Sequence, residues 1–231
     1  MDWIKIRRLF KKIPILGSII RWVYHKLIIV DESFEGSKSY WIERYNEGGD
    51  SGCGSYNKFA DFKAEIINDF ILENNIRNVI EYGCGDGNQL KLADYPSYIG
   101  FDVSPKALSL CERLFQHDNT KNFKLMHDYD NETADLTVSL DVVFHLVEDD
   151  TFTDYMNRLF DSSDKFVIIY SSNTKKNHIW QSAHVRHRCF SDWIKDNKPN
   201  WKLIKHIPNR YPYENDNKAG SMAEFFIYEK V

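Results

Sequence analysis

The stretch Glu81-Tyr82-Gly83-Cys84-Gly85-Asp86-Gly87 decides the fold class of this chain. It ends a short apolar run at residues 78–82, which predicts a buried strand, and a helix is expected from about residue 88. Glycines at a strand-to-helix turn let a ligand approach the backbone closely, and the amides of the following helix offer hydrogen-bond donors. The stretch therefore predicts a ligand site at the carboxyl end of the first strand.

The spacing of these glycines and the acid before them indicate which ligand the turn suits. The pattern is G-x-G-x-G, whereas the turn that grips a dinucleotide pyrophosphate has the pattern G-x-G-x-x-G. Glu81 would repel a pyrophosphate, but its carboxylate suits a cation such as an amino-acid ammonium. A nicotinamide-dependent dehydrogenase is therefore disfavoured.

Strands and helices alternate along the rest of the chain. Further strands are predicted at residues 98–102, 123–126, 134–140 and 165–170, and an antiparallel pair at 201–206 and 225–228. Helices are predicted from about residue 58, over residues 151–160, and after Ser104-Pro105, where serine suits the N-cap and proline the first turn. This alternation predicts an α/β fold with a doubly wound, mainly parallel sheet.

Length, charge and cysteine content narrow the class of protein. The 231 residues fit one domain with a modest appendage. The formal net charge of -4 disfavours a nucleic-acid partner. The four cysteines form no C-x-x-C pair and have no zinc-ligand spacing, so we expect no metal site. They indicate reduced thiols in a cytoplasmic protein.

The first 57 residues differ from the predicted domain at 58–231. Residues 1–30 are basic and amphipathic. They predict either an anchor on the inner face of an anionic membrane, or a helical arm packed on the domain or on a partner subunit. Residues 46–55 hold four glycines and are a candidate lid or a plain connector. The sequence predicts no oligomeric state.

The glycine stretch, Asp102 at the end of the second strand, and Asp141 after the fourth together resemble the cofactor-binding signature of class I S-adenosylmethionine-dependent methyltransferases. The resemblance covers roughly residues 58–231 and implies a Rossmann-like fold. It also implies S-adenosylmethionine as methyl donor and S-adenosylhomocysteine as product. An acid in the position of Asp102 can also accept hydrogen bonds from both ribose hydroxyls.

The resemblance assigns cofactor contacts residue by residue. It implies that the methionine part is held by the loop residues Glu81, Gly83, Cys84, Gly85 and Gly87, with the ribose bound by Asp102. It implies further that Asp128 contacts the adenine amino group and that Val103 and Tyr129 flank the adenine ring.

The segment Ser139 to Leu146 matches the part of such enzymes that lies beside the sulfonium and the acceptor. Asp141 is expected to orient the methionine end or the acceptor. His145 lies four residues on, so a helical turn would place both side chains on one face. A neutral imidazole there could act as general base on an acceptor hydroxyl, or His145 could be structural.

A second cluster predicts the acceptor side of the site. Its members follow the fifth strand or precede the domain, and they are Tyr40, Arg44, His184, Arg186, His187 and Arg188. Such side chains could hold a phosphate, a carboxylate or a nucleotide-linked sugar, although a solvated basic loop would have the same composition.

Residues 11–17 and 40–56 resemble small methyltransferases associated with bacterial capsule and lipopolysaccharide gene clusters. That resemblance implies methylation of a small or glycan acceptor, at a sugar hydroxyl or a phosphoramidate substituent. Two alternatives stay open. A nucleic-acid amino-methyltransferase is disfavoured because Asp141-Val142-Val143-Phe144 lacks the prolines that help clamp a flipped base. A non-catalytic module that keeps the cofactor fold is the other.

Overall fold

A computed structural model describes residues 34–231 except 178–180, 215 and 217. The described part of the chain contains a seven-stranded sheet in the order β3-β2-β1-β4-β5-β7-β6. Its strands are β1 Val79–Tyr82, β2 Tyr98–Asp102, β3 Lys121–Leu125, β4 Ala134–Leu140, β5 Ser163–Ser171, β6 Trp201–Ile207 and β7 Glu224–Lys230. β1 to β5 are mutually parallel, whereas β7 is antiparallel to both of its neighbours.

The strand order reverses at β1. The chain runs outward from β1 through β2 to β3 and then crosses back to β4 on the other side of β1. Ligands of open α/β sheets bind at such a switch point, beyond the carboxyl ends of the strands. The topology therefore places the end of β1, where the glycine stretch begins, at the expected ligand crevice.

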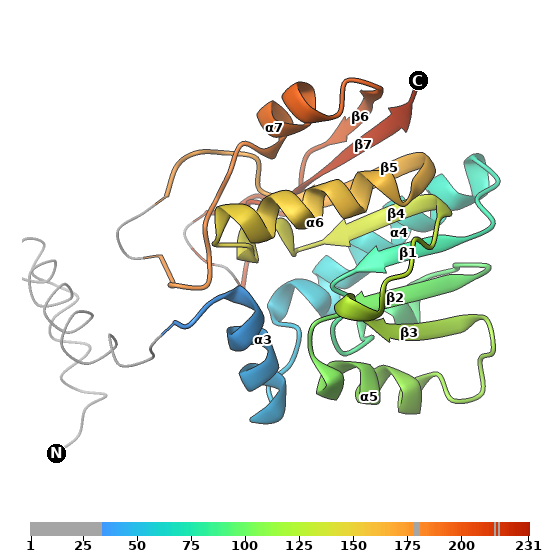
Figure 1. The fold of residues 1–231 in the computed structure, drawn as a ribbon. Helices are drawn as coiled ribbons and strands as arrows, with labels where there is room; N and C mark the ends of the chain where they lie inside the picture. The colour runs from blue at the N-terminus through green and yellow to red at the C-terminus, as the bar shows by residue number, and fades with distance from the viewer. Residues whose placement is uncertain (1–33, 178–180, 215, 217) are drawn as a thin grey trace, which may run out of the picture.

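Helices cover both faces of the sheet, as Figure 1 shows. The α-helices are α3 Ser37–Asn46, α4 Asn57–Glu73, α5 Pro105–Leu114, α6 Asp149–Asp161 and α7 Phe190–Asn197. Short 3₁₀ turns are η2 Cys53–Ser55, η3 Gln89–Leu92, η4 Met126–Asp128 and η5 Val143–His145. One apolar core joins α4 and α5 to the sheet, and a second joins α6 and α7 to its other face.

The alternating side chains of β5 explain the two cores. Phe166, Ile168 and Tyr170 enter the α4 core, whereas Val167 and Ile169 enter the α6 core. A strand that is buried on both faces has a continuous run of apolar residues, and such a run in the sequence predicted this strand.

The predicted α/β fold with a doubly wound, mainly parallel sheet is confirmed. Two local predictions were wrong. The helix expected from residue 88 is the single 3₁₀ turn η3. Asp141 has φ 60°, so no helical turn runs from Asp141 to His145, and only Val143–His145 is 3₁₀. The helices α3 and α7 were not predicted.

The predicted arm and its membrane contact at residues 1–30 lie outside the described residues. Within the described part of the chain, no helix is both long and apolar enough to cross a bilayer.

Candidate active site

The glycine stretch forms a tight turn whose positive φ angles suit glycine. Gly83 and Gly85 have φ 83° and 59°. A Cβ on Gly83 would lie 2.5 Å from Val142 Cγ2, and one on Gly85 would lie 2.3 Å from Ser51 Oγ. The backbone amide of Gly83 donates to the Phe101 carbonyl at 2.7 Å, which ties the turn to β2. Glycine is thus required at both positions, because Val142 and Ser51 pack directly against the turn.

A cavity lies at this turn, between the strand ends and a covering segment that we call the cap, residues 37–56. The ends of β1, β2 and β4 contribute Glu81, Cys84, Asp102, Val103, Leu140 and Asp141. The cap contributes Ser37, Lys38, Trp41, Tyr45, Ser51 and Ser55. Figure 1 shows α3 beyond the carboxyl ends of β1 and β2. The cap includes the predicted lid at residues 46–55.

Asp102 is buried beneath the glycine turn at the end of β2. Its Oδ2 accepts from the Gly85 amide at 2.9 Å, and its Oδ1 accepts from the Ser104 amide at 2.9 Å. Burial raises the pKa of Asp102, against the lowering effect of these amides. The Val103 amide also hydrogen-bonds this carboxylate, so three of its four acceptor sites are used and one is left for a ligand donor. Asp102 can therefore receive a ligand hydroxyl, and its contact with both ribose hydroxyls stays a prediction.

Glu81, at the end of β1, is a buried carboxyl that lines the same cavity. The Tyr98 hydroxyl donates to its Oε2 at 2.6 Å. Burial raises the pKa of Glu81 to about 7, against the lowering effects of the Tyr98 hydrogen bond and the Lys63 charge. A cation placed beside Glu81 would favour its ionised form.

Lys63 is a site residue that the sequence reasoning missed. Its side chain is fully buried on α4, and its Nζ lies 2.7 Å from Asp141 Oδ2. The ammonium also lies 5.2 Å from the centre of the Tyr170 ring. The available signal was a lysine within the apolar stripe of a predicted helix, because a lysine there is buried only if it has a partner. Asp141 lines the cavity with this ion pair behind it.

His145 lines the cavity from η5. Its Nδ1 lies 3.0 Å from the His184 carbonyl oxygen. A carbonyl only accepts, so Nδ1 carries the proton and Nε2 has a free lone pair. Burial lowers the pKa of His145 to about 3, although the His184 carbonyl opposes this shift. The imidazole is therefore neutral at physiological pH.

Tyr40 and His184 lie beside His145, so the structure brings these three predicted residues together. The rings of Tyr40 and His184 stack with centroids 4.1 Å apart, and His184 stacks on His145 at 5.3 Å. The Trp41 ring meets His145 edge-on at 5.0 Å. Burial lowers the pKa of His184 to about 4. These side chains form an aromatic wall, in which Trp41 and His145 line the cavity and His184 and Tyr40 stack in turn behind His145.

The three predicted arginines have protein partners. Arg44 pairs with Asp50 inside the cap at 3.0 Å. Arg186 and Arg188 donate to the Val147 carbonyl at 2.8 and 2.7 Å, and both pair with Asp149. The second pair therefore fastens the segment at 184–188 to the start of α6. Contact of these arginines with an acceptor stays a prediction, and so does that of His187, whose Nδ1 lies 2.6 Å from Ser172 Oγ.

Two residues predicted at the adenine lie beside the cavity rather than in its lining. Asp128 is exposed at the end of η4, and Tyr129 packs edge-on against Tyr82 and Phe101. Met126 and Val103 line the cavity on this side. The adenine contacts of Asp128 and Tyr129 stay predictions.

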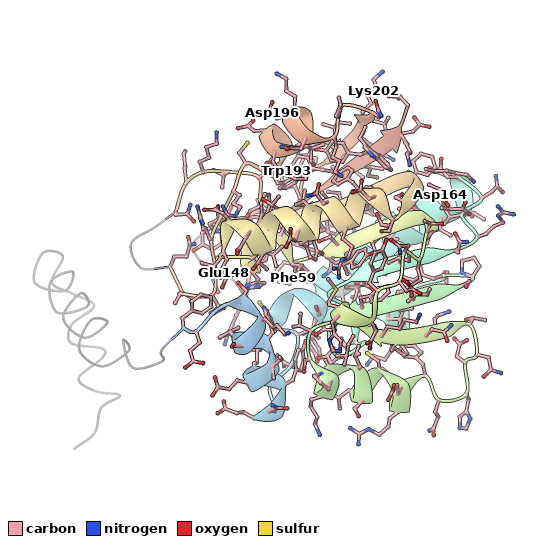
Figure 2. All side chains as sticks on the ribbon, in the orientation of Figure 1. Phe59, Glu148, Asp164, Trp193, Asp196 and Lys202 are labelled. Atoms are coloured by element: carbon pink, nitrogen blue, oxygen red, sulfur yellow. The ribbon has the colours of Figure 1, made fainter. Side chains whose placement is uncertain are left out.

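The cap is fastened at both ends. At one end the Ser37 amide and hydroxyl donate to Glu148 at 2.8 and 2.7 Å, and the Val147 amide donates to Ser37 Oγ at 2.9 Å. Figure 2 shows Glu148 at this end of α3. At the other end the Ser51 amide and the Tyr56 hydroxyl donate to Asp86 in the glycine turn.

Comparison with known proteins agrees with this geometry. Residues 80–168 match a family model described as a methyltransferase domain. That segment runs from β1 into β5 and includes the glycine turn, Asp102, Asp141 and His145. No curated protein matches the chain.

Solved structures with a similar fold include methyltransferases. The N-methyltransferase NodS from Bradyrhizobium japonicum, in complex with S-adenosylhomocysteine, has 14% identity and a TM-score of 0.64; the match covers 85% of this chain and 99% of NodS. Magnesium protoporphyrin IX methyltransferase from Synechocystis, with bound S-adenosylmethionine, has 12% identity and a TM-score of 0.59; the match covers 84% of this chain and 97% of that enzyme. The methyltransferase domain of bacterial CtHen1-C has 18% identity and a TM-score of 0.57; the match covers 74% and 97% of the two chains.

These identities are low, so the similarity concerns the fold. These structures confirm the predicted Rossmann-like fold. The family match assigns residues 80–168 to a methyltransferase domain, and the predicted domain bounds of 58–231 stay a prediction.

Proposed function

We propose that this chain is a methyltransferase that moves the methyl group of S-adenosylmethionine to a hydroxyl oxygen of a small or glycan acceptor. The observation that carries the proposal is one cavity with three features. It has the glycine turn at the sheet's switch point, buried acids at the ends of β1 and β2, and a neutral imidazole at the wall. When bound, S-adenosylmethionine supplies an activated methyl group.

The residues present suit this cofactor. Gly83, Cys84 and Gly85 of the turn line the cavity, and the carboxylate of Asp102 can accept a further hydrogen bond from a hydroxyl. Glu81 offers a buried carboxyl to an ammonium. Val103 and Met126 offer apolar surface to a purine. The arrangement fits an adenosyl group joined to an amino acid.

On the acceptor side, His145 can accept the hydroxyl proton at Nε2. Its tautomer is fixed by the His184 carbonyl, so the free lone pair is held on one nitrogen. Trp41 and Tyr45 from the cap line the cavity with aromatic surface. Methyl transfer is an in-line displacement, and fixed orientation of the reactants supplies up to about 7–11 kcal/mol of the barrier reduction.

The finer proposal is that the acceptor is a sugar hydroxyl or a phosphoramidate substituent used in bacterial capsule or lipopolysaccharide biosynthesis. The aromatic wall of Tyr40, Trp41 and His184 supports a sugar, since the apolar face of a sugar ring packs well against aromatic rings. The resemblance at residues 11–17 and 40–56 supports the same class.

The test is an acceptor screen with the full-length protein. S-adenosylhomocysteine release is measured with nucleotide sugars, phosphoramidate-bearing glycans, small amines and RNA oligonucleotides. We expect turnover with a hydroxyl-bearing glycan and a methyl ether in its product by mass spectrometry. Methylation of RNA alone or of an amine alone would contradict the proposed acceptor. A folded protein that binds S-adenosylhomocysteine but methylates nothing would favour a non-catalytic module.

A further inference from the structure

Gln89 lies at the start of η3, just after the glycine turn, and lines the cavity. Its side chain is buried, with 7% exposed. Its amide oxygen is the buried side-chain polar atom that has no hydrogen-bond partner in the described part of the chain. A buried acceptor without a donor is costly to folding, so such an atom in a cavity wall points to a ligand donor.

The orientation of this amide is fixed by its other end. Gln89 Nε2 donates to the Ala60 carbonyl at 3.1 Å. Rotating the amide by half a turn would place its oxygen against that carbonyl, and two acceptors would then face each other. The oxygen is therefore the atom left without a partner, and the vacant interaction requires a donor.

The charges around this part of the cavity indicate which donor. Glu81, Asp102 and Asp141 are acidic and line the same cavity, whereas the positive charges are Lys38, which also lines it, and Lys63, which is already bonded to Asp141. With all three acids ionised and both lysines charged, the balance is one negative charge. A cation with several N–H donors satisfies both the charge and the orphaned oxygen. An ammonium has three such donors.

We propose that the Gln89 amide oxygen accepts a hydrogen bond from the ammonium group of the cofactor's methionine part, with Glu81 as the charged partner of the same ammonium. The proposal rests on the proposed function. It makes Gln89 a binding residue that discriminates ligands with an α-ammonium from those without one.

The experiment compares two ligands by isothermal titration with the full-length protein. One is S-adenosylhomocysteine, and the other is its deamino analogue, in which hydrogen replaces the ammonium. Gln89→Met keeps the length of the side chain and removes the acceptor. We expect this change to weaken S-adenosylhomocysteine binding about tenfold and to leave the analogue within about twofold, because only the former loses a hydrogen bond to a charged group.

Asp102→Ala is the matched control, since loss of the ribose acceptor should weaken both ligands alike. Thermal melting establishes that each variant is folded. If the Met variant does not fold, Gln89→Leu replaces it, since this change also removes the acceptor and should lower the preference for S-adenosylhomocysteine in the same way.

Equal weakening of both ligands by Gln89→Met, or no weakening of either, would overturn the role of Gln89 and leave the proposed function standing. The same holds if Gln89→Leu, used in its place, gives either of these results. Failure of the wild-type protein to bind either ligand would overturn the proposed function as well.

Discussion

At the scale of single residues, the tautomer of His145 is the feature with the most direct chemical consequence. The His184 carbonyl holds the proton on Nδ1, and burial lowers the pKa to about 3. A histidine that stays neutral across the physiological range is a base at every working pH. The pH profile of turnover will therefore lack the inflection near pH 6.5 that the titration of an exposed histidine produces.

His145→Ala should therefore lower turnover by about 10²-fold, the low end of the usual contribution of a positioned general base, because a pKa of about 3 makes its imidazole a weak base. S-adenosylhomocysteine affinity should stay within about threefold, because His145 lies on the acceptor side. His206→Ala is the control, since His206 is a partly exposed histidine paired with Glu224 on the edge strand β6. Full activity in the His145 variant would make the residue structural.

Glu81 predicts a pH dependence of cofactor binding. Its pKa in the free protein is raised to about 7, so the carboxyl is largely protonated below that pH. A cationic ligand needs the carboxylate and lowers this pKa, so binding releases a proton below about pH 7. Affinity for S-adenosylhomocysteine should thus rise with pH up to about 7 and then level off.

Isothermal titration at several pH values, in two buffers of different ionisation enthalpy, measures both the slope and the released proton. Glu81→Gln should bind weakly at every pH and lose the slope. A wild-type affinity that is constant from pH 5.5 to 8 would contradict this coupling.

At the scale of elements, the strands were predicted well and the small turns poorly. β2 and β4 have the predicted bounds because short apolar runs flanked by polar residues are typical of buried strands. η3 is one turn because the chain leaves the helical conformation at Ala93, and nothing local indicates that end. α3 was missed because its aromatic and charged residues follow no clear helical period. Tertiary contacts with the other residues around the cavity stabilise α3.

The hydrogen bonds at the two ends of the cap predict the rate at which S-adenosylhomocysteine dissociates. Tyr56→Phe removes one hydrogen bond to Asp86, and Ser37→Ala removes the side-chain bonds at the other end. Each loss should destabilise the closed cap by about 1 kcal/mol, so S-adenosylhomocysteine should dissociate roughly five times faster. Stopped-flow displacement measures this rate.

Ser163→Ala serves as the control for that series. It removes one buried side-chain hydrogen bond, to the Phe166 carbonyl, at the start of β5 and so at the opposite edge of the sheet from the cavity. An unchanged dissociation rate in both cap variants would show that the cap opens without breaking these bonds.

At the scale of the whole molecule, the strand order brings together residues that are far apart in sequence. Glu81, Asp102 and Asp141 meet because β2, β1 and β4 are neighbours with their carboxyl ends at one edge. The alternating pattern predicted that edge and those acids. Lys63 and Gln89, which lie close to these acids, were not predicted. The burial of Lys63 beside Asp141 and the unpaired amide oxygen of Gln89 arise only when the chain packs.

The contacts of the residues predicted to bind the acceptor depend still more on tertiary packing. His145, His184 and Tyr40 were proposed separately, and their stacking follows from the fastening of two distant segments around α6. No local pattern predicts that Arg186 and Arg188 donate their hydrogen bonds to the backbone carbonyls of Leu146 and Val147. Sequence reasoning thus predicted more of the side chains that line the cavity at the strand ends than of the contacts made by residues 184–188.

The most direct test of the central claim is isothermal titration of S-adenosylhomocysteine into wild-type protein, Asp102→Ala and Asp135→Ala. Asp135 is the matched control, a buried acid that accepts from the Arg77 amide and pairs with Lys165 away from the cavity. We predict micromolar binding by the wild type, at least tenfold weaker binding by Asp102→Ala, and wild-type affinity in folded Asp135→Ala. No binding by folded wild-type protein, or equal affinity in all three, would contradict the assignment of this cavity to S-adenosylmethionine.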